Sequence, residues 1–556
     1  MDLGFKDKSN EQKLLDRPFI KQILLILFLW VLVVAWRPYY FGFYHDDWAS
    51  VVSIPHTISL FAIKNSLMKD PTRPLYPFII YVIGLVCGKS PLRWQFTLAF
   101  VQLLCSISIM YASTFLLDRM REAVKEETRW CGAIAGILWF VFPWSLGYSA
   151  WPVMLPPDIG VVLSVLGIIV AIKSDEKIWN IVLSVSLFSL SWLIYESTWF
   201  IWVPVAILLL KNGFLNKTKL SYALRFLTIS LAVQVLFVVG NRSLSAGNLT
   251  GKHLSLAILS TLKTDVALLR TELVPSLSAA LADWKIFIAF GMSALAVGMF
   301  ANLKRFKSSF SGFVILAALL IGLILSAILY AAAGYSIEWT GLFSRTTLSV
   351  SLYLTIASSI LFGMAWINAS KSIKILAVTG IMAIFIPLTT SLANQSVLWH
   401  KSWLEQQKIL NAIPDRVIDL ADATSTVLMD VPRGTGPVFT FSAFWDISGA
   451  VASRKPSLNE PTGLRFLVTV LRLGEWRTTW DGKMVRQAWC SSPNIPLWGL
   501  EAQHVYIWKY PEKKATPVLA PYDSGCNVHG AVFVGATKNG FKEFQKIVMN
   551  RAYPEG

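Results

Sequence analysis

The sequence predicts an all-α, polytopic membrane domain of about 11 transmembrane helices with additional interfacial helices, followed by a C-terminal extracytoplasmic α/β domain. Three observations lead to this fold class. Hydrophobic residues make up 54% of the 556 positions and charged residues only 15%, with a mean hydropathy of +0.55, whereas a soluble domain carries about 25% charged residues. Long apolar runs alternate with short basic clusters, and the hydropathy falls after Leu392. The 23 tryptophans suit membrane–water interfaces.

The N-terminal segment 1–18 carries Lys6, Lys8, Lys13 and Arg17 and precedes the first long apolar run, residues 19–36. Because basic residues are retained on the cytoplasmic side, this segment is predicted to be cytoplasmic and the loop after the run to be outside. The run is long and no small-residue cleavage site follows it, so it does not resemble a cleavable signal. The net charge of +17 lies mostly in such clusters, which points to membrane lipids rather than nucleic acid as the surroundings.

Residues 74–88 form a shorter apolar run that Pro74 opens. About 15 residues are too few to cross a bilayer, so this run is predicted to be interfacial or re-entrant. That choice also places the basic cluster around Arg121, which follows the run 96–117, in the cytoplasm. Further crossings are predicted at 131–150, 158–172, 178–195, 198–210, 222–240, 286–303, 311–332, 346–367 and 374–391. The membrane domain then extends over 19–392, with long outer loops at 37–95 and 241–285.

Residues 393–556 are predicted to form a separate soluble domain outside the membrane, because short strand-like runs such as VLMDV, GPVFTF and HVYIWKY alternate there with turn residues. Cys490 and Cys526 are its only cysteines, and an oxidising compartment would allow them to form a disulfide. The stretch FSAFWDISG contains Phe444, Trp445 and Asp446. These residues suit either a carbohydrate-binding platform or an ordinary buried aromatic cluster.

The stretch YHDDWAS, directly after the first crossing, holds the adjacent acids Asp46 and Asp47. A single aspartate would suffice to cap the helix that begins near Trp48. Two neighbouring carboxylates repel, so one of them can have a raised pKa and accept a proton near neutral pH. Tyr44, His45 and Trp48 add polar and aromatic groups beside them. The sequence therefore predicts a catalytic acid pair with these three neighbours as sugar- or acceptor-binding residues.

Three basic residues of the outer loops are candidates for binding a phosphate. Arg73 lies in DPTRPLYP, Arg345 in GYSIEWTGLFSRTTLS, and Lys64 precedes Arg73 in the same loop. A guanidinium offers paired donors that match phosphate oxygens. Two alternatives stay open at this point: Arg73 could place its charge in the interface without a ligand, and Arg345 could form a structural ion pair with Glu338. Tyr335 and Glu338 are candidate sugar- or acceptor-binding residues of the same turn.

Two further outer positions are candidates for contacting a sugar or an acceptor. Asp158 opens an outward-facing helix end in WPVMLPPDIG, where helix capping explains it equally well. Tyr195 and Glu196 occupy a tight outer turn in SWLIYESTW. A glutamate in such a turn is costly unless it faces a water-filled cavity. The chain has no Walker A loop, no HExxH motif and no clustered His/Cys set, so nucleotide hydrolysis and zinc chemistry have no support.

This arrangement resembles the glycosyltransferase C superfamily. The resemblance is carried by a cytoplasmic N-terminus, one crossing, the acidic pair Asp46-Asp47 opening a long outer loop, the stretch Arg73-Pro74-Leu75-Tyr76, and Tyr195-Glu196. Members are polytopic enzymes that transfer a sugar from a polyprenyl-phosphate carrier on the extracytoplasmic face. The layout is most similar to bacterial O-antigen-type glucosyl- and arabinosyltransferases, which implies a multi-pass protein of the bacterial inner membrane.

The resemblance implies a single-sugar transfer to a hydroxyl of a cell-envelope glycan or lipid, with inversion at the anomeric carbon. Asp46 or Asp47 would remove the hydroxyl proton, and arginines would stabilise the leaving phosphate. The acidic set is thinner than in members that bind a divalent metal, which favours a metal-independent, cofactor-free enzyme. We expect a monomer.

Other functions remain open from the sequence alone. A glycan polymerase or ligase also uses lipid-linked sugars outside the membrane, but such enzymes rely on a late outer loop with Arg and His groups. A lipid-linked sugar transporter would need charged or broken helices at mid-membrane, whereas the polar residues here collect at the outer helix ends. A non-enzymatic assembly scaffold is a third class.

Overall fold

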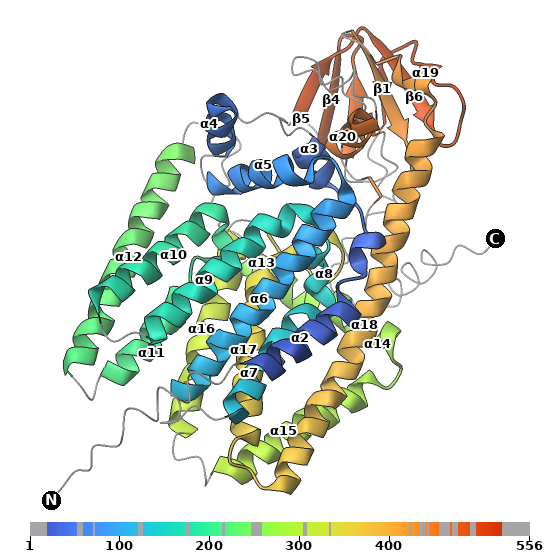
Figure 1. Ribbon diagram of the computed structural model, residues 1–556. Coiled ribbons are helices and arrows are strands. Elements are labelled where there is room, and N and C mark those ends of the chain that lie inside the picture. The colour runs from blue at the N-terminus through green and yellow to red at the C-terminus, as the bar shows by residue number, and fades with distance from the viewer. Residues whose placement is uncertain are drawn as a thin grey trace, which may run out of the picture.

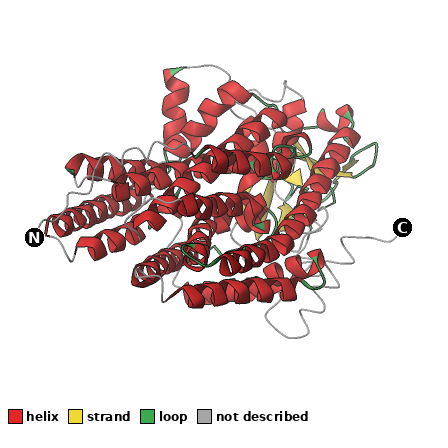
Figure 2. Ribbon diagram, turned by 60° about the horizontal axis from the view of Figure 1, so that its bottom comes forward, coloured by secondary structure: helices red, strands yellow, loops and turns green. Residues whose placement is uncertain are grey.

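The computed structural model describes a helical bundle with strands at one end (Figures 1 and 2). The residues that it describes are 19–52, 59–70, 73–119, 126–173, 177–213, 217–245, 258–303, 309–332, 335–421, 424–432, 438, 440–441, 444–454, 468–469, 476–489 and 496–524. The strands gather beyond one end of the bundle, which we call the sheet-bearing end.

Within the described residues, eight helical segments are long and apolar enough to cross a membrane. They are Ile20–Tyr39, Pro91–Asp118, Pro152–Lys173, Lys217–Gly240, Trp284–Ala301, Gly312–Ala332, Leu342–Trp366 and Lys371–Ala412. Glu126–Val141 and Pro143–Ser149 together would make a ninth span, bent by 60° at the break. Two short 3-10 turns, Arg37–Tyr39 and Pro152–Met154, extend the first and third of these segments. The chain is therefore a multi-pass, predominantly helical protein.

The helices that form these segments pack along one another (Figure 1). Their bounds are α2 Ile20–Val33, α6 Pro91–Arg119, α7 Glu126–Val141, α8 Leu146–Ser149, α9 Leu155–Lys173, α12 Lys217–Ser245, α15 Trp284–Leu303, α16 Ser309–Ala332, α17 Leu348–Trp366 and α18 Lys371–Ala412. Only 22% of the most apolar window of Ile20–Tyr39 is buried, against 78% of that of Leu342–Trp366. Peripheral helices thus leave apolar side chains for lipid, while α17 lies inside the bundle.

Two of the predicted crossings form helices that are shorter than a full span. They are α10 (Ile178–Ile194, 17 residues) and α11 (Trp202–Gly213, 12 residues). At about 1.5 Å per residue the second would cover about 18 Å, well below the hydrocarbon thickness of about 30 Å. α10 packs along α9, and α11 packs along α12. The predicted count of about 11 crossings therefore corresponds to eight full-length segments, one bent pair and two short helices.

Residues 37–95, which are predicted to form an outer loop and are called the first outer loop below, also contain helices. α3 (Asp46–Val52), α4 (Leu60–Lys69) and α5 (Leu75–Cys87) lie at the sheet-bearing end, and α5 runs across the ends of neighbouring helices (Figure 1). α5 has 13 residues, too few to cross. Ser59 caps α4, its hydroxyl accepting a hydrogen bond from the Ala62 N–H at 3.0 Å. Gly88, with φ +55°, ends α5 in a conformation that favours glycine.

The last helix of the bundle joins the two parts of the molecule. α18 has 42 residues, about 63 Å at 1.5 Å per residue, and it continues beyond the bundle toward the sheets (Figure 1). The predicted domain boundary at 392/393 falls inside this helix. Three side chains on one face of its outer part, Trp399, Trp403 and Gln406, contact the first outer loop. Their spacing of four and three residues places them on the same side of the helix.

The C-terminal region contains two small sheets. In the first the strand order is β2-β1-β6-β7, with β1 parallel to both β2 and β6; in the second it is β5-β4-β3-β8, all antiparallel. The strands are β1 Ser425–Asp430, β2 Val468–Thr469, β3 Trp476–Trp480, β4 Met484–Trp489, β5 Pro496–Glu501, β6 His504–Lys509, β7 Thr516–Pro517 and β8 Tyr522–Asp523. Helices α19 (Asp415–Ile418) and α20 (Phe444–Arg454) complete the region. An α/β arrangement was predicted here, and α20 packs on α3 of the first outer loop.

Candidate functional site

The two adjacent aspartates begin α3, yet they occupy very different surroundings. Asp47 is fully buried. Its Oδ2 accepts a hydrogen bond from the Tyr44 N–H at 2.7 Å and its Oδ1 accepts one from the Val153 N–H at 2.8 Å. Burial raises the pKa of Asp47 well above its ordinary value, while these two N–H donors oppose that shift. With both oxygens bonded and none exposed, Asp47 joins the first outer loop to the turn that precedes α9.

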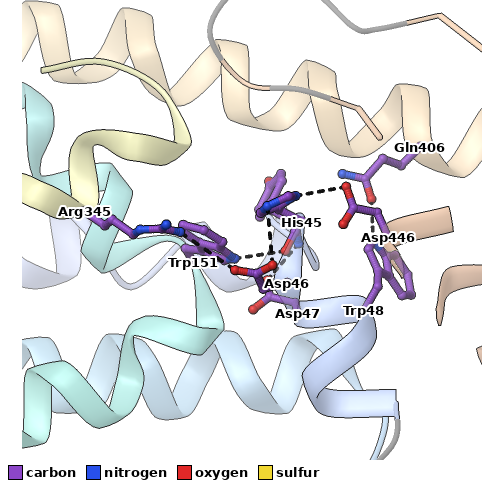
Figure 3. Close-up of polar contacts among 9 residues, drawn as sticks. His45, Asp46, Asp47, Trp48, Trp151, Arg345, Gln406 and Asp446 are labelled. Carbon is purple, nitrogen blue, oxygen red and sulfur yellow. Dashed lines mark hydrogen bonds and ion pairs between the residues drawn. The ribbon is translucent and has the colours of Figure 1, made fainter. Parts of the chain in front are cut away.

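Asp46 is the accessible member of the pair. Its side chain is 38% exposed. One carboxylate oxygen lies 3.8 Å from Nη1 of Arg345, and the other lies 3.4 Å from Nε2 of His45 (Figure 3). Asp46 is therefore a solvent-accessible carboxylate between two groups that can carry positive charge.

Arg345 is held on an aromatic surface. Its guanidinium lies 4.8 Å from the ring centroid of Trp151 and 5.3 Å from that of Phe343. Trp151 is fully buried and donates its indole N–H to the Tyr44 carbonyl at 2.9 Å, so the ring cannot turn away. Such a stacked guanidinium directs its N–H donors along the edge of the stack, where Nη1 already faces the Asp46 carboxylate at 3.8 Å and where an anion could also bind.

Close packing behind Arg345 sets its position. Arg345 belongs to the 3-10 helix η6 (Leu342–Thr347), which follows Gly341 at φ +70°. Gly147 of α8 lies against this helix: an added Cβ there would be 2.2 Å from the Ser344 Oγ and 2.5 Å from the Arg345 backbone N. Only a glycine allows this approach, so α8 and η6 determine where the guanidinium lies.

Arg73 belongs to a second, neighbouring group. It forms an ion pair with Glu196, and its guanidinium lies 4.6 Å from the Tyr195 ring centroid. Burial lowers the pKa of Arg73, but Glu196, Tyr195 and Asp70 together raise it by more, so the pKa lies above its ordinary value. The sequence offers no basic residue in the turn of Glu196. Its partner Arg73 comes from the first outer loop instead. Tyr76, whose hydroxyl donates to the Val153 carbonyl at 3.0 Å, lies close to both groups.

The turn before Arg345 is held by two acids of the outer loop 241–285. The Ile337 N–H donates to Asp265 at 2.8 Å and the Trp339 N–H donates to Glu272 at 2.7 Å. Burial raises the pKa of Glu272 to about 7, although the backbone donors lower it. These acids lie in α13 (Ile258–Leu268) and in the following π-helical turn (Leu269–Leu273). The sequence analysis did not single them out, because acids in a long loop give no periodic signal.

His45 connects the site to the C-terminal region. Its Nδ1 lies 3.0 Å from Oδ2 of Asp446 in α20, and Figure 3 shows the imidazole between this carboxylate and Asp46. Burial lowers the pKa of His45, but the carboxylates of Asp446 and Asp46 outweigh it, so the pKa lies above its ordinary value of 6.5. Asp446 had been considered only as part of an aromatic platform; the side chains of its neighbours Phe444 and Trp445 lie outside the described residues.

Several predicted site residues lie apart from this cluster or have other roles. Asp158 is fully buried in α9 and accepts a hydrogen bond from Gln102 at 2.5 Å, so it does not face the exposed Asp46. Tyr44 is buried and donates its hydroxyl to the Trp399 carbonyl at 3.0 Å. Lys64 is exposed on α4, and the described contacts of Asp46 and Arg345 do not include it.

The remaining predicted residues fall into three cases. The indole N–H of Trp48 donates to Gln406 at 2.8 Å, which gives this buried ring a packing role. Tyr335 lies near Tyr195 at the edge of the Arg73 group, and the backbone N–H of Glu338 donates to Thr346 at 3.0 Å. The ion pair that the structure gives Arg345 is with Asp46 rather than Glu338. Cys490 and Cys526 lie outside the described residues.

Metal binding was predicted to be unnecessary. In the described ranges, no group of three or more His, Cys, Asp or Glu side chains is placed to hold a metal ion. Metal independence stays a prediction, because it concerns the reaction rather than these side chains.

Similarity to known proteins is found among solved structures. No family model and no curated protein matches this chain. Among solved structures the chain is similar to the Archaeoglobus fulgidus oligosaccharyltransferase, crystallised with a tethered acceptor peptide that contains the NVT sequon. The two chains are 11% identical, and their TM-score is 0.40 over 78% of this chain and 63% of that chain. The match thus extends over less than two thirds of the oligosaccharyltransferase.

Proposed function

We propose that this protein is a membrane glycosyltransferase that moves a single sugar from a polyprenyl-phosphate donor to a hydroxyl of a cell-envelope glycan or lipid on the extracytoplasmic face. Asp46 is the general base and Arg345 binds the donor phosphate. The observation that carries the proposal is their juxtaposition: an exposed carboxylate lies 3.8 Å from a guanidinium stacked on Trp151.

The location of this pair fits a lipid-linked donor. α3, which carries Asp46, lies at the sheet-bearing end of the bundle (Figure 1), and η6, which carries Arg345, runs directly into the long apolar helix α17. A polyprenyl chain can remain in the apolar layer while its phosphate reaches the guanidinium. The acceptor needs a group that removes its hydroxyl proton, since a neutral hydroxyl is a poor nucleophile. A carboxylate and a cation for phosphate, side by side, meet both needs.

The proposed transfer is a single displacement. The acceptor oxygen forms a bond to the anomeric carbon as its proton passes to the Asp46 carboxylate. The bond between the anomeric carbon and the phosphate oxygen breaks, and the electron pair leaves with the polyprenyl phosphate. Arg345 stabilises the charge that grows on that phosphate. The products are the glycosylated acceptor, polyprenyl phosphate and a protonated Asp46, which returns its proton to solvent.

The geometry favours Asp46 over Asp47 as the base. A general base must lie within hydrogen-bond reach of the proton that it abstracts. Both oxygens of Asp47 are occupied by backbone N–H donors inside the protein, whereas Asp46 is accessible. The raised pKa of Asp47 therefore reflects its burial rather than a catalytic role. Arg73 is already paired with Glu196, so it is a secondary candidate that would have to share its donors with a phosphate.

The proposal is tested in proteoliposomes that contain the purified protein. Polyprenyl-phosphate-glucose and polyprenyl-phosphate-arabinose are supplied with extracted envelope glycolipid, and released polyprenyl phosphate and the glycosylated product are measured by mass spectrometry. Asp46→Asn should lower turnover by at least about 100-fold, because proton transfer by a positioned base contributes about 10²–10⁴. Glu501→Gln, which changes an exposed carboxylate of β5, is the matched control and should keep full activity.

A binding measurement separates donor recognition from chemistry. Polyprenyl phosphate binding to the detergent-solubilised protein is followed by tryptophan quenching. Arg345→Gln should weaken it by about tenfold or more, since one charge-assisted contact contributes about 1.5–3 kcal/mol. Full turnover by folded Asp46→Asn protein, or unchanged phosphate binding by folded Arg345→Gln protein, would show the assignment to be wrong.

A further inference from the structure

The C-terminal region makes a polar contact with the proposed base through a single imidazole. Asp446 lies in the first turn of α20, which packs on α3, and its side chain is only 1% exposed. Its Oδ2 is 3.0 Å from Nδ1 of His45, and Nε2 of His45 is 3.4 Å from Oδ1 of Asp46. A buried carboxylate of the C-terminal region and the accessible carboxylate of the membrane domain thus face the two nitrogens of the same ring.

The surroundings of the His45 ring favour the doubly protonated imidazole. Each nitrogen faces a carboxylate oxygen, and only the imidazolium has an N–H at both positions. The charged groups near the ring are Asp46 on α3, Asp446 on α20 and Arg345 on η6, the last of which opposes protonation. Two carboxylates on opposite edges outweigh one guanidinium. His45 therefore links the two acids, one at each ring nitrogen.

The backbone of His45 is in a conformation that the chain does not adopt by itself. Its φ is +39°, in the left-handed region that costs a residue with a Cβ about 1–3 kcal/mol unless its surroundings hold it. The next residue is Asp46, so any relaxation of His45 turns the proposed base. Asp47 holds the stretch on the membrane-domain side through the backbone N–H groups of Tyr44 and Val153. On the other side the side-chain contact is Asp446.

We propose that Asp446 is a positioning residue of the transfer site: by binding His45 it holds the strained turn that aims Asp46, so the C-terminal region is part of the site. This inference rests on the proposed function of Asp46. It goes beyond that function because it assigns a role to a residue of a different part of the chain, about 400 positions away. The helix α18 supports the same arrangement, since Gln406 accepts the indole N–H of Trp48 in α3.

The test uses full-length protein in proteoliposomes with the polyprenyl-phosphate sugar that the unmodified protein turns over. Asp446→Asn keeps the shape of the side chain but removes its charge, and it should lower kcat by about 10- to 100-fold, as small misplacements of a catalytic group do. KM for the donor should change little, because Arg345 is untouched. Glu501→Gln, an exposed acid of the same region, should leave both constants unchanged.

Two further readouts distinguish positioning from mere folding. Losses from Asp446→Asn and His45→Gln should not add in the double variant, since both break one link. Asp446→Asn removes a carboxylate that raises the pKa of His45. The alkaline limb of the profile of kcat against pH should therefore move to lower pH. The inference would be overturned if the losses of kcat from the two single variants add in the double variant. It would also be overturned if Asp446→Asn leaves both the pH profile and kcat per folded molecule unchanged. If Asp46→Asn alone retains activity, the proposed function fails instead, which is a different result.

Discussion

Replacement of Asp47 should destabilise the protein far more than replacement of its neighbour Asp46. The Asp47 carboxylate accepts two backbone N–H groups, at 2.7 Å from Tyr44 and 2.8 Å from Val153. All three residues are buried, so the two N–H groups have no access to solvent if the acceptor is removed.

The magnitude follows from these two hydrogen bonds. A buried donor left without a partner costs about 1–3 kcal/mol. Asp47→Ala leaves two such donors and should lower the free energy of unfolding by about 2–6 kcal/mol. Asp47→Asn keeps one acceptor oxygen but turns an N–H₂ group toward the other donor, so its cost should be about 1–3 kcal/mol. Asp46→Asn alters a partly exposed ion pair whose atoms are 3.8 Å apart and should cost about 1 kcal/mol.

Equilibrium unfolding in mixed micelles, followed by tryptophan fluorescence, gives these values. The order of stability should be unmodified protein, Asp46→Asn, Asp47→Asn and then Asp47→Ala. The reasoning fails if Asp47→Ala unfolds at the same denaturant concentration as the unmodified protein, or if Asp46→Asn is the least stable of the three variants. Either result would mean that Asp47 is not the acceptor that joins the first outer loop to the turn before α9.

Three further predictions concern groups around the site. Gly147→Ala places a methyl group against the Arg345 backbone; polyprenyl phosphate binding, measured by tryptophan quenching, should weaken by about tenfold while the fold persists, since the clash displaces one phosphate-binding group. In the ion pair between Arg73 and Glu196, unfolding of the single and double variants should give a coupling free energy of about 1–3 kcal/mol. The pKa of Glu272 is raised from 4.5 to about 7 in the folded protein, so its contribution to stability is full below pH 4.5 and is lost as the pH rises through 7. Acidification from pH 8 to 6 should therefore add about 1 kcal/mol to the free energy of unfolding. Glu272→Gln should remove that part of the pH dependence.

Each of these has a control or a result that would contradict it. Gly240→Ala adds a methyl group where the surroundings are open, so phosphate binding should not change. A coupling energy near zero between Arg73 and Glu196 would mean that the pair does not hold the two outer loops together. A pH dependence that is the same with and without Glu272 would assign it to another group, of which Asp265, whose pKa is also raised by burial, is the first to test.

The pattern of apolar runs predicted most of the fold because it depends on local sequence. A run of sufficient length must form a helix to satisfy its backbone in an apolar layer, and eight segments and a bent pair follow from that. The short run at 74–88 forms the 13-residue helix α5, and its interfacial placement stays a prediction. The local pattern could not show that α18 continues through Leu392. Its outer half is less apolar, and it packs against Tyr44 and Trp48, which are distant in the sequence.

The candidate site could be predicted in its components but not in their pairing. Asp46, Asp47, Arg73 and Arg345 were recognisable because charged residues beside long apolar runs are costly and therefore uncommon. Periodicity and spacing carry no information on which distant groups will meet. For this reason the sequence showed no basic residue in the turn of Glu196 but could not show that Arg73 pairs with it.

The sequence by itself indicated a multi-pass membrane protein with two adjacent acids after its first apolar run. The tertiary structure decided the surroundings of each acid. Asp47 is buried and accepts hydrogen bonds from the backbone of Tyr44 and Val153, whereas Asp46 is accessible and lies between Arg345 and His45. The physical reason is that the charge of a residue and the length of an apolar run are properties of the local sequence. The surroundings of a carboxylate depend on residues that only folding brings together.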